Sequence, residues 1–383
     1  MRSTDSRVPV YALTVALLAL GLAACGGGGG GGFSGGGSSS SGGSSSGSSS
    51  SSSGSSSSSS SSSGGSSSSS SSGSSGAPPT LQQRQAAAEA TAAGNAACTG
   101  LGPFYWEIGD QSGPLDSASL PSGDTTYTAA TTVPIYSASK WLFAAFVAQM
   151  RGSDSALSGD IPALTMTSGY VSMPNGGCQP SDTVASCASS SPNDDLTVTE
   201  VGRFYYGSGH FQHLGADTSL GIAGDDTTAL AAALRNTLGT DVDVSWSTPE
   251  LAGGAVASAN AYGAFLRHVM ATAPATPLVM GAELGLHKVC TNCATSDSVP
   301  GPPMDTEQWN YSLGHWVEDD PAVGDHAFSS PGFAGFYPWI DASRTWYGLL
   351  VRDDASSLAS GFTASIACGR LIRKAWISGA AVP

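Results

Sequence analysis

Hydrophobic and polar positions along this chain predict an α/β domain preceded by a long segment without any hydrophobic pattern. Alanine-rich stretches, apolar runs and helical spacing predict helices over 82–97, 140–150, 227–238, 260–273 and 361–376. Short aromatic and β-branched runs favour strands over 104–108, 125–135, 311–317, 335–340 and 345–351. Residues 169–195 are rich in Pro, Gly, Ser and Asn, so we expect loops there. Strands at both ends, helices between them and a returning last helix indicate a sheet with a helical insert.

The first 25 residues are typical of an export signal. Arg2 and Arg7 precede an apolar run, 8–22, that is too short to span a bilayer comfortably. The run ends in the letters LAAC, which resemble the lipobox of bacterial lipoproteins, where the cysteine is lipidated. We therefore expect a lipid anchor on Cys25 in the cell envelope; an ordinary cleaved signal with an incidental cysteine is the alternative. In a host with two membranes, the resemblance to lipoproteins implies the periplasmic face of the outer membrane rather than the inner membrane, because Gly26 and not Asp follows this cysteine.

Residues 26–80 are expected to be a disordered tether, because from 26 to 76 they are almost entirely Gly and Ser and have nothing to bury. Such a tether spans roughly 40 Å and either gives reach within the cell wall or is a passive spacer. Residues 81–383 remain for the globular domain. The chain has 14 basic and 29 acidic residues, which argues against nucleic acid or an anionic membrane face as a partner. The short acidic run 318–320 is most simply a solvated loop.

Cysteine usage indicates disulfide bonds. Seven cysteines are present, and the six that follow Cys25 are an even number in a chain expected to be exported. Local pairing favours Cys178–Cys187 and Cys290–Cys293, which leaves Cys98–Cys368, although six cysteines allow 15 connectivities. A metal or redox site at the C-x-x-C pair is the alternative, but no second pair has zinc-site spacing. We expect no metal and no cofactor.

A serine and a lysine three positions apart carry the candidate chemistry. Ser137-Ala138-Ser139-Lys140 lies where an extended segment enters the apolar helix at 140–150. Residues three apart share a helix face, so the amine of Lys140 can lie beside the hydroxyl of Ser137. A desolvated lysine can take the proton of a serine and so make it a nucleophile. The alternative is a serine that caps the helix and a lysine that reaches solvent.

Further segments, in the same order along the chain, resemble the motifs of class C β-lactamases and their related carboxypeptidases and esterases. The matched segments and family patterns are LTMTSG at 164–169 (LLTHTSG), GRFYYGS at 202–208 followed by LG at 214–215 (PGxxFxYSN…LG), GGAVAS at 253–258 (GGLxST), YSLG at 311–314 (YGLGW) and HAFSSPGF at 326–333 (KTGxTxGF). The resemblance covers nearly all of 104–376. It implies an antiparallel sheet flanked by the N- and C-terminal helices, with an all-helical and loop subdomain.

Carried over residue by residue, the resemblance implies an acyl-enzyme on Ser137. Lys140 would accept the serine proton, and the phenol of Tyr206 would relay a proton to the leaving group. The alternative for Tyr206 is a core aromatic. Backbone N–H groups of Ser137 and Ser329 would form the oxyanion hole.

Three positions depart from the family pattern. Ser208 stands where the family usually has Asn, His326 where it usually has Lys, and Phe328 where it has Gly. The Phe328 ring is expected to crowd a substrate lying along this strand. We therefore expect hydrolysis of a small-molecule or peptide substrate, an ester, an amide or a peptidoglycan-type peptide, more than strong β-lactam hydrolysis. A catalytically silent binding protein of the envelope is the alternative, and a purely structural lipoprotein is a third reading.

Overall fold

The computed structural model describes residues 77–152, 157–172, 177–272, 275, 277–293, 303–304, 306–354 and 361–383. The expected signal sequence, Cys25 and the part of the predicted tether up to residue 76 lie outside the described residues. Pro78–Pro383 is one compact unit. None of the helices within the described ranges has the length and apolar character needed to cross a membrane.

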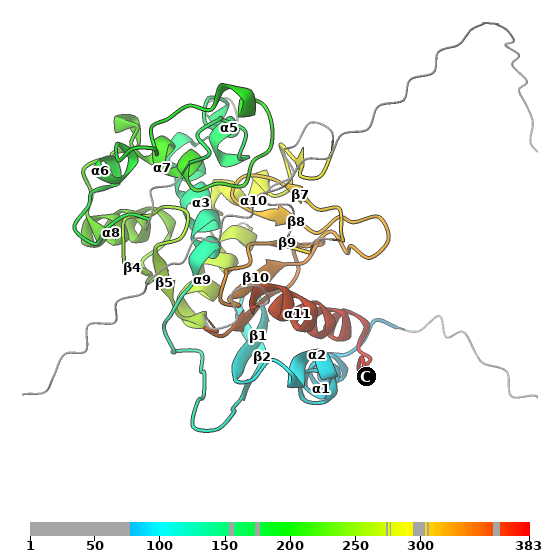
Figure 1. Cartoon of the computed structure of the whole chain (residues 1–383). Helices are drawn as coiled ribbons and strands as arrows, with labels where there is room; N and C mark the ends of the chain where they lie inside the picture. Colours follow the sequence, from blue (N-terminus) through cyan, green and yellow to red (C-terminus); the bar gives the residue numbers. More distant parts are fainter. Residues whose placement is uncertain are drawn as a thin grey trace, which may run out of the picture. The chain divides into compact units, whose positions relative to one another are not determined.

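The centre of the domain is an antiparallel sheet of eight strands in the order β2-β1-β11-β10-β9-β8-β7-β6 (Figure 1). These strands are β1 (Phe104–Asp110), β2 (Gly113–Leu120), β6 (Val289–Cys290), β7 (Asn310–Tyr311), β8 (Trp316–Val317), β9 (Phe328–Ser329), β10 (Tyr337–Ile340) and β11 (Tyr347–Val351). A second sheet has the order β3-β5-β4 and contains β3 (Val133–Pro134), β4 (Ser245–Trp246) and β5 (Ala255–Ala257). The antiparallel sheet confirms the predicted fold class.

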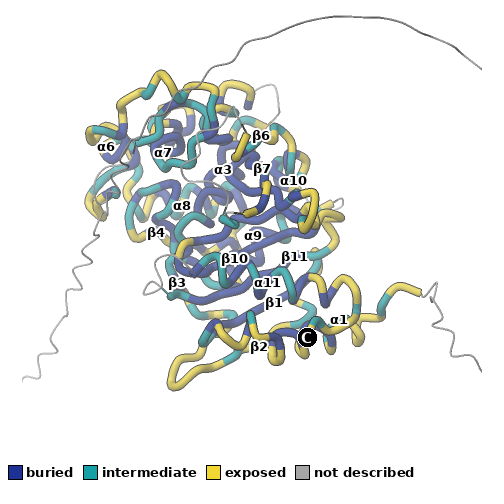
Figure 2. Tube along the Cα trace, turned by 45° about the vertical axis from the view of Figure 1, so that its right-hand side comes forward, coloured by how far each residue is buried: buried dark blue, intermediate teal, exposed yellow. Residues whose placement is uncertain are grey.

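Helices cover both faces of the large sheet. The first and last helices, α1 (Leu81–Gly94), α2 (Ala96–Thr99) and α11 (Gly361–Ser378), lie together on one face (Figure 1). The opposite face carries α3 (Ser139–Arg151), α9 (Ala259–Met270) and α10 (Val279–Glu283). Successive side chains at the start of β11 point to opposite faces of the sheet. Trp346 packs on Trp376 of α11, whereas the hydroxyl of Tyr347 accepts a hydrogen bond from Arg267 of α9. Strands β10 and β11 are consequently buried along their whole length (Figure 2).

A group of short helices forms the helical part of the domain, on the far side of α3 from α11 (Figure 1). It contains α5 (Ile161–Leu164), α6 (Val184–Ala188), α7 (Gly209–Gly215) and α8 (Thr227–Leu238), with the 3-10 turns η2 (Val198–Glu200) and η3 (Thr218–Leu220). Asp226 caps the start of α8, because its carboxylate accepts hydrogen bonds from two backbone N–H groups of the first turn, and Gly239 follows the last helical residue. Its bounds are those predicted from the apolar spacing.

Helix α3 runs through the core between these parts. The 3-10 turn η1 (Tyr136–Ala138) leads into it, and every residue of 139–148 is buried, which confirms the prediction for this apolar run. Gly314, with φ +70°, lets a loop approach the helix backbone, since a Cβ there would lie 2.5 Å from the Lys140 carbonyl oxygen. The helix ends at Gly152, which adopts the left-handed conformation.

Several sequence predictions were wrong. Residues 125–135 contain only the two-residue strand β3, and the edge strand β2 was missed because its Gly, Ser and Pro residues resemble a loop. The segment 311–317 is a tight hairpin of β7 and β8 rather than one strand. Helix α6 interrupts the region predicted as loops at 169–195.

The acidic run at 318–320 is not a solvated loop, because Glu318 is fully buried. Its carboxylate accepts hydrogen bonds from Arg373 of α11 at 2.6 Å and from the Tyr337 hydroxyl at 2.6 Å. Arg373, itself fully buried, also pairs with Asp325 at 2.7 Å. This network attaches the last helix to the sheet, and a buried charge needs such partners.

Three disulfides are present, Cys98–Cys368, Cys178–Cys187 and Cys290–Cys293, the pairs that local pairing favours in the sequence. The first joins α2 to α11 across 270 residues, and both of its cysteines are fully buried. It therefore fixes the start of the domain to its last helix.

Candidate active site

Ser137 and Lys140 lie side by side where η1 meets α3. The amine of Lys140 donates a hydrogen bond of 3.0 Å to the Ser137 hydroxyl oxygen and one of 2.9 Å to the carbonyl oxygen of Ala252. Lys140 is only 3% exposed, so its amine is removed from bulk water. The residue before the serine, Tyr136, has a φ of +45°, which marks a sharp turn at this point of the chain. A buried amine in contact with a serine hydroxyl has the geometry required for proton transfer between them.

Tyr206 faces the same amine. The Lys140 Nζ atom lies 4.7 Å from the centre of the Tyr206 ring. The ring stacks on Trp316 at 5.3 Å and meets Tyr311 edge-on at 5.8 Å. Tyr206 therefore belongs to an aromatic cluster and has its ring face beside the lysine.

A buried histidine holds the segment that carries Tyr206. His210 of α7 accepts a 2.7 Å hydrogen bond on Nδ1 from the Ser168 hydroxyl, and its Nε2 donates at 2.9 Å to the carbonyl of Tyr205. Burial lowers the pKa of His210 to about 4, so the imidazole is neutral at pH 7. His210 therefore supports the backbone next to Tyr206, and both of its ring nitrogens have hydrogen-bond partners.

Ser208 and Glu250 join two further segments at the site. Ser208 precedes α7, yet its hydroxyl makes no capping hydrogen bond to the helix; it interacts instead with the carboxylate of Glu250. Burial raises the pKa of Glu250, while the charge of Lys140 and the Ser208 hydroxyl lower it. Sequence reasoning missed Glu250. A carboxyl group directly before the small and apolar segment 251–257 was the signal that could have found it.

Strand β9 meets the nucleophile through the residue after it. The hydroxyl of Ser330 donates a 3.2 Å hydrogen bond to the carbonyl oxygen of Ser137. The Ser329 side chain is fully buried, and its hydroxyl makes no hydrogen bond within the described ranges. The residues predicted to form the oxyanion hole thus belong to adjoining segments.

Phe328 does not crowd this face of β9, which corrects the expectation from sequence. Side chains alternate along a strand, so Phe328 and Ser329 project to opposite sides. The Phe328 ring is 8% exposed and meets His315 edge-on at 5.9 Å, close to Gly285. The guanidinium of Arg344 lies 5.8 Å from the ring centre. The ring therefore packs in the core.

His326 stands apart from the other candidates. It is exposed, has a φ of +62°, and its backbone N–H donates to the carbonyl oxygen of Glu318. In the described part of the chain no hydrogen bond or ion pair joins its imidazole to Ser137, Lys140 or Tyr206. The preceding residue, Asp325, turns toward Arg373 of α11.

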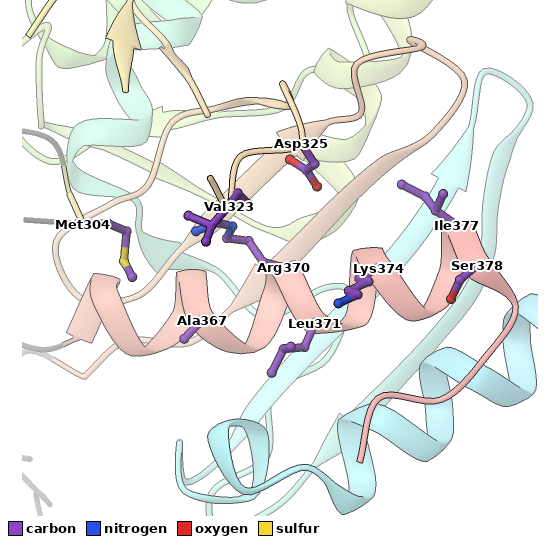
Figure 3. Close-up of a pocket in the computed structure, with 9 residues that line it drawn as sticks. All are labelled: Met304, Val323, Asp325, Ala367, Arg370, Leu371, Lys374, Ile377 and Ser378. Carbon is purple, nitrogen blue, oxygen red and sulfur yellow. Dashed lines mark hydrogen bonds between the residues drawn. The ribbon is translucent and has the colours of Figure 1, made fainter. Parts of the chain in front are cut away.

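A hollow of about 610 Å³ lies elsewhere, along α11 (Figure 3). Apolar side chains of Met304, Val323, Leu371 and Ile377 form much of its lining, with Arg370 and Lys374 beside them. None of the catalytic candidates contributes to it, so we do not assign the active site there. Among the described residues, no group of three or more His, Cys, Asp and Glu side chains is placed to hold a metal ion.

Comparison with solved structures identifies the fold. No protein-family model matches the chain, and no curated protein matches it significantly. A candidate β-lactamase from Bacteroides dorei aligns with a TM-score of 0.53 and 20% identity over 72% of this chain and 93% of its own. A penicillin-binding protein homolog from Caulobacter crescentus aligns with a TM-score of 0.53 and 12% identity over 74% and 97%. EstCE1, a hydrolase with promiscuous acyltransferase activity, aligns with 0.53 and 13% over 78% and 99%.

The comparison therefore assigns this protein to a class by its fold. This chain has the fold of the β-lactamases and penicillin-binding proteins, as its motifs predict. Each of these alignments covers more than nine tenths of the matched protein, so the likeness extends over the whole domain and not over one motif.

Proposed function

We propose that this protein is an acyl-serine hydrolase with Ser137 as its nucleophile. One observation carries the proposal: the buried amine of Lys140 lies 3.0 Å from the Ser137 hydroxyl, at the entrance of a helix buried on every side. A buried lysine is costly without a partner of opposite charge in direct contact, so its placement against a serine suggests chemistry rather than stability. The shared fold with EstCE1, a hydrolase, supports this reading.

The reaction then has two steps. The Ser137 oxygen attacks the acyl carbon of the substrate while its proton passes to the Lys140 nitrogen, and a proton relayed by Tyr206 leaves with the departing group. Water then attacks the acyl-enzyme, and the acyl group departs as a carboxylic acid while Ser137 recovers its proton. The backbone N–H groups of Ser137 and Ser329 are the proposed donors to the oxyanion. Removal of one such donor typically costs 10²–10³ in rate.

An ester or amide substrate is favoured, a peptidoglycan-type peptide included. Family members that bind a substrate carboxylate use a lysine and small residues on this strand, whereas here an exposed His326 and a core-packed Phe328 stand at those positions. Strong β-lactam hydrolysis is therefore not expected. We further propose that Cys25 holds the domain in the cell envelope, because the letters LAAC that end the apolar run resemble a lipobox.

Covalent labelling tests the proposal. The full chain is incubated with a fluorophosphonate and its intact mass is measured, alongside Ser137→Ala and the control Ser112→Ala, a change of an exposed serine in the β1–β2 turn. One adduct on the wild type and on Ser112→Ala, with none on Ser137→Ala, is the expected result. A folded wild type that takes up no adduct contradicts the proposal and favours the silent binding protein.

A further inference from the structure

A carboxylate close to the catalytic lysine is absent from the motifs that point to the active site. Glu250 lies two residues before Ala252, whose carbonyl oxygen accepts the 2.9 Å hydrogen bond from the Lys140 amine. The backbone between them forms a tight turn, because the Glu250 carbonyl oxygen accepts from the N–H of Gly253 at 3.1 Å and of Gly254 at 2.7 Å. One turn thus supplies both a neutral ligand and a negative charge to the surroundings of Lys140.

The carboxylate of Glu250 occupies a space made by two glycines. A Cβ on Gly177 would lie 2.9 Å from one carboxylate oxygen, and a Cβ on Gly253 would lie 3.0 Å from the other. A side chain at either position would press on a carboxylate oxygen and displace it, so the two glycines leave the space in which the carboxylate lies.

Ser208 completes the setting of Glu250. A serine directly before a helix ordinarily caps it, but the Ser208 hydroxyl makes no capping hydrogen bond and interacts with the Glu250 carboxylate instead. Ser208 follows Tyr206 by two residues, so this interaction links the tyrosine segment to the turn that holds Lys140.

On the basis of the proposed function, we propose that Glu250 is a positioning residue that acts on Lys140 by charge and on the Tyr206 segment through Ser208. During acylation the Ser137 O–H bond breaks, its proton binds the lone pair of the Lys140 nitrogen, and the serine oxygen bonds to the acyl carbon. The ammonium ion so formed is buried and needs a compensating charge. The carboxylate of Glu250 supplies that charge and takes up no proton in the step.

The arrangement predicts a dependence on pH. Burial raises the pKa of Glu250, and the charge of Lys140 in its protonated form lowers it. The Ser208 hydroxyl and the two glycines next to the carboxylate do not titrate in this range. As the pH falls through the raised pKa, Glu250 becomes neutral and acylation slows. Because the Ser208 hydroxyl lowers this pKa, its removal moves the acid limb of the rate profile to higher pH.

The test is the rate constant of fluorophosphonate labelling as a function of pH, measured on the full chain. We compare the wild type with Glu250→Gln, Glu250→Asp, Ser208→Ala and the control Glu89→Gln, which makes the same chemical change on the exposed face of α1. Glu250→Gln is expected to label about tenfold or more slowly at neutral pH, and its remaining rate should fall less steeply in acid. Glu250→Asp should label faster than Glu250→Gln. Ser208→Ala should move the acid limb of the profile to higher pH, and Glu89→Gln should match the wild type.

The outcomes separate the two proposals. A folded Glu250→Gln with the wild-type rate and profile overturns the role of Glu250 and leaves the proposed function standing. If Glu250→Gln does not fold, the pH profile of labelling in Ser208→Ala is the test. An acid limb shifted to higher pH supports the role of Glu250, and an acid limb at the wild-type pH overturns it. A wild type that is not labelled overturns the proposed function and the role of Glu250 with it.

Discussion

The hydroxyl of Ser330 donates a hydrogen bond of 3.2 Å to the carbonyl oxygen of Ser137, across 193 positions of the sequence. This contact joins the end of strand β9 to the turn that carries the nucleophile. The two segments that are proposed to supply oxyanion donors are thereby held together by one side chain. The nucleophile depends on the sheet as well as on the helix that it precedes.

Ser330→Ala is therefore expected to weaken the site without unfolding the protein. The free energy of unfolding should fall by about 0.5–1.5 kcal/mol, the net contribution of one hydrogen bond. The rate of covalent labelling of Ser137 should fall as well, because β9 is no longer tied to the turn. Chemical denaturation and labelling kinetics measure the two effects. An unchanged labelling rate would mean that β9 holds its place without this contact.

Tyr206→Phe separates the two readings of Tyr206. Phenylalanine retains the ring that stacks on Trp316 and faces Lys140, so the free energy of unfolding should change little. If the phenol relays a proton, hydrolysis of an ester substrate should slow by about 10²–10⁴. The measurement is steady-state hydrolysis beside a thermal melt. Full activity in the variant would assign Tyr206 to the core alone.

His210 makes the stability of the domain fall in acid. Its pKa is about 4 in the folded state, and about 6.5 is usual for an exposed histidine. As the pH falls below about 6.5, the unfolded chain binds a proton that the folded chain does not, so stability is lost until the pH reaches about 4. The loss is on the order of 3 kcal/mol.

The comparison that isolates this effect is His210→Gln. The variant is expected to be less stable at neutral pH, because it disturbs the hydrogen bonds to Ser168 and Tyr205, but its stability should depend less on pH. Denaturation of both proteins between about pH 7 and pH 4 gives the difference. Contributions of groups that are the same in both proteins cancel in it, including that of His315, whose pKa burial also lowers to about 4. Parallel curves would show that His210 does not titrate in this way.

The Cys98–Cys368 bridge should contribute far more stability than Cys290–Cys293. The first closes 270 residues and is fully buried, whereas the second closes three. Loss of the long bridge in Cys98→Ser/Cys368→Ser should lower the free energy of unfolding by about 2–5 kcal/mol, and Cys290→Ser/Cys293→Ser should cost much less. Mild reductant should open the short bridge first, because Cys293 is exposed. Non-reducing peptide mapping detects the opening of each disulfide, and a different pairing of the cysteines would contradict the structure.

The proposed lipid anchor is Cys25, which lies outside the described residues. Cys25→Ser, expressed as the full chain in a host that processes lipoproteins, is expected to move the protein from the membrane fraction to the soluble one. Separation of inner and outer membranes by density would then test the preference for the outer membrane. A variant that remains membrane-bound would exclude this anchor.

Local patterns predicted much of the fold and part of the site. The apolar run at 140–150 and the spacing at 227–238 predicted two helices because a helix buries its apolar residues at a local period. Ser137 and Lys140 were predicted to meet because three positions on a helix bring side chains together by backbone geometry alone. Strand β2 was missed, since an edge strand needs little apolar surface and leaves a weak pattern.

The remaining features were decided by tertiary structure. Glu250 and Ser208 meet across segments far apart in the sequence, Glu318 is buried only because Arg373 of the last helix reaches it, and the Phe328 ring enters the core because of the face that β9 presents. The sequence alone determined the candidate nucleophile and its lysine, because their proximity is set by one turn of backbone. Which charges surround that pair depends on packing between distant segments, and no local period records it.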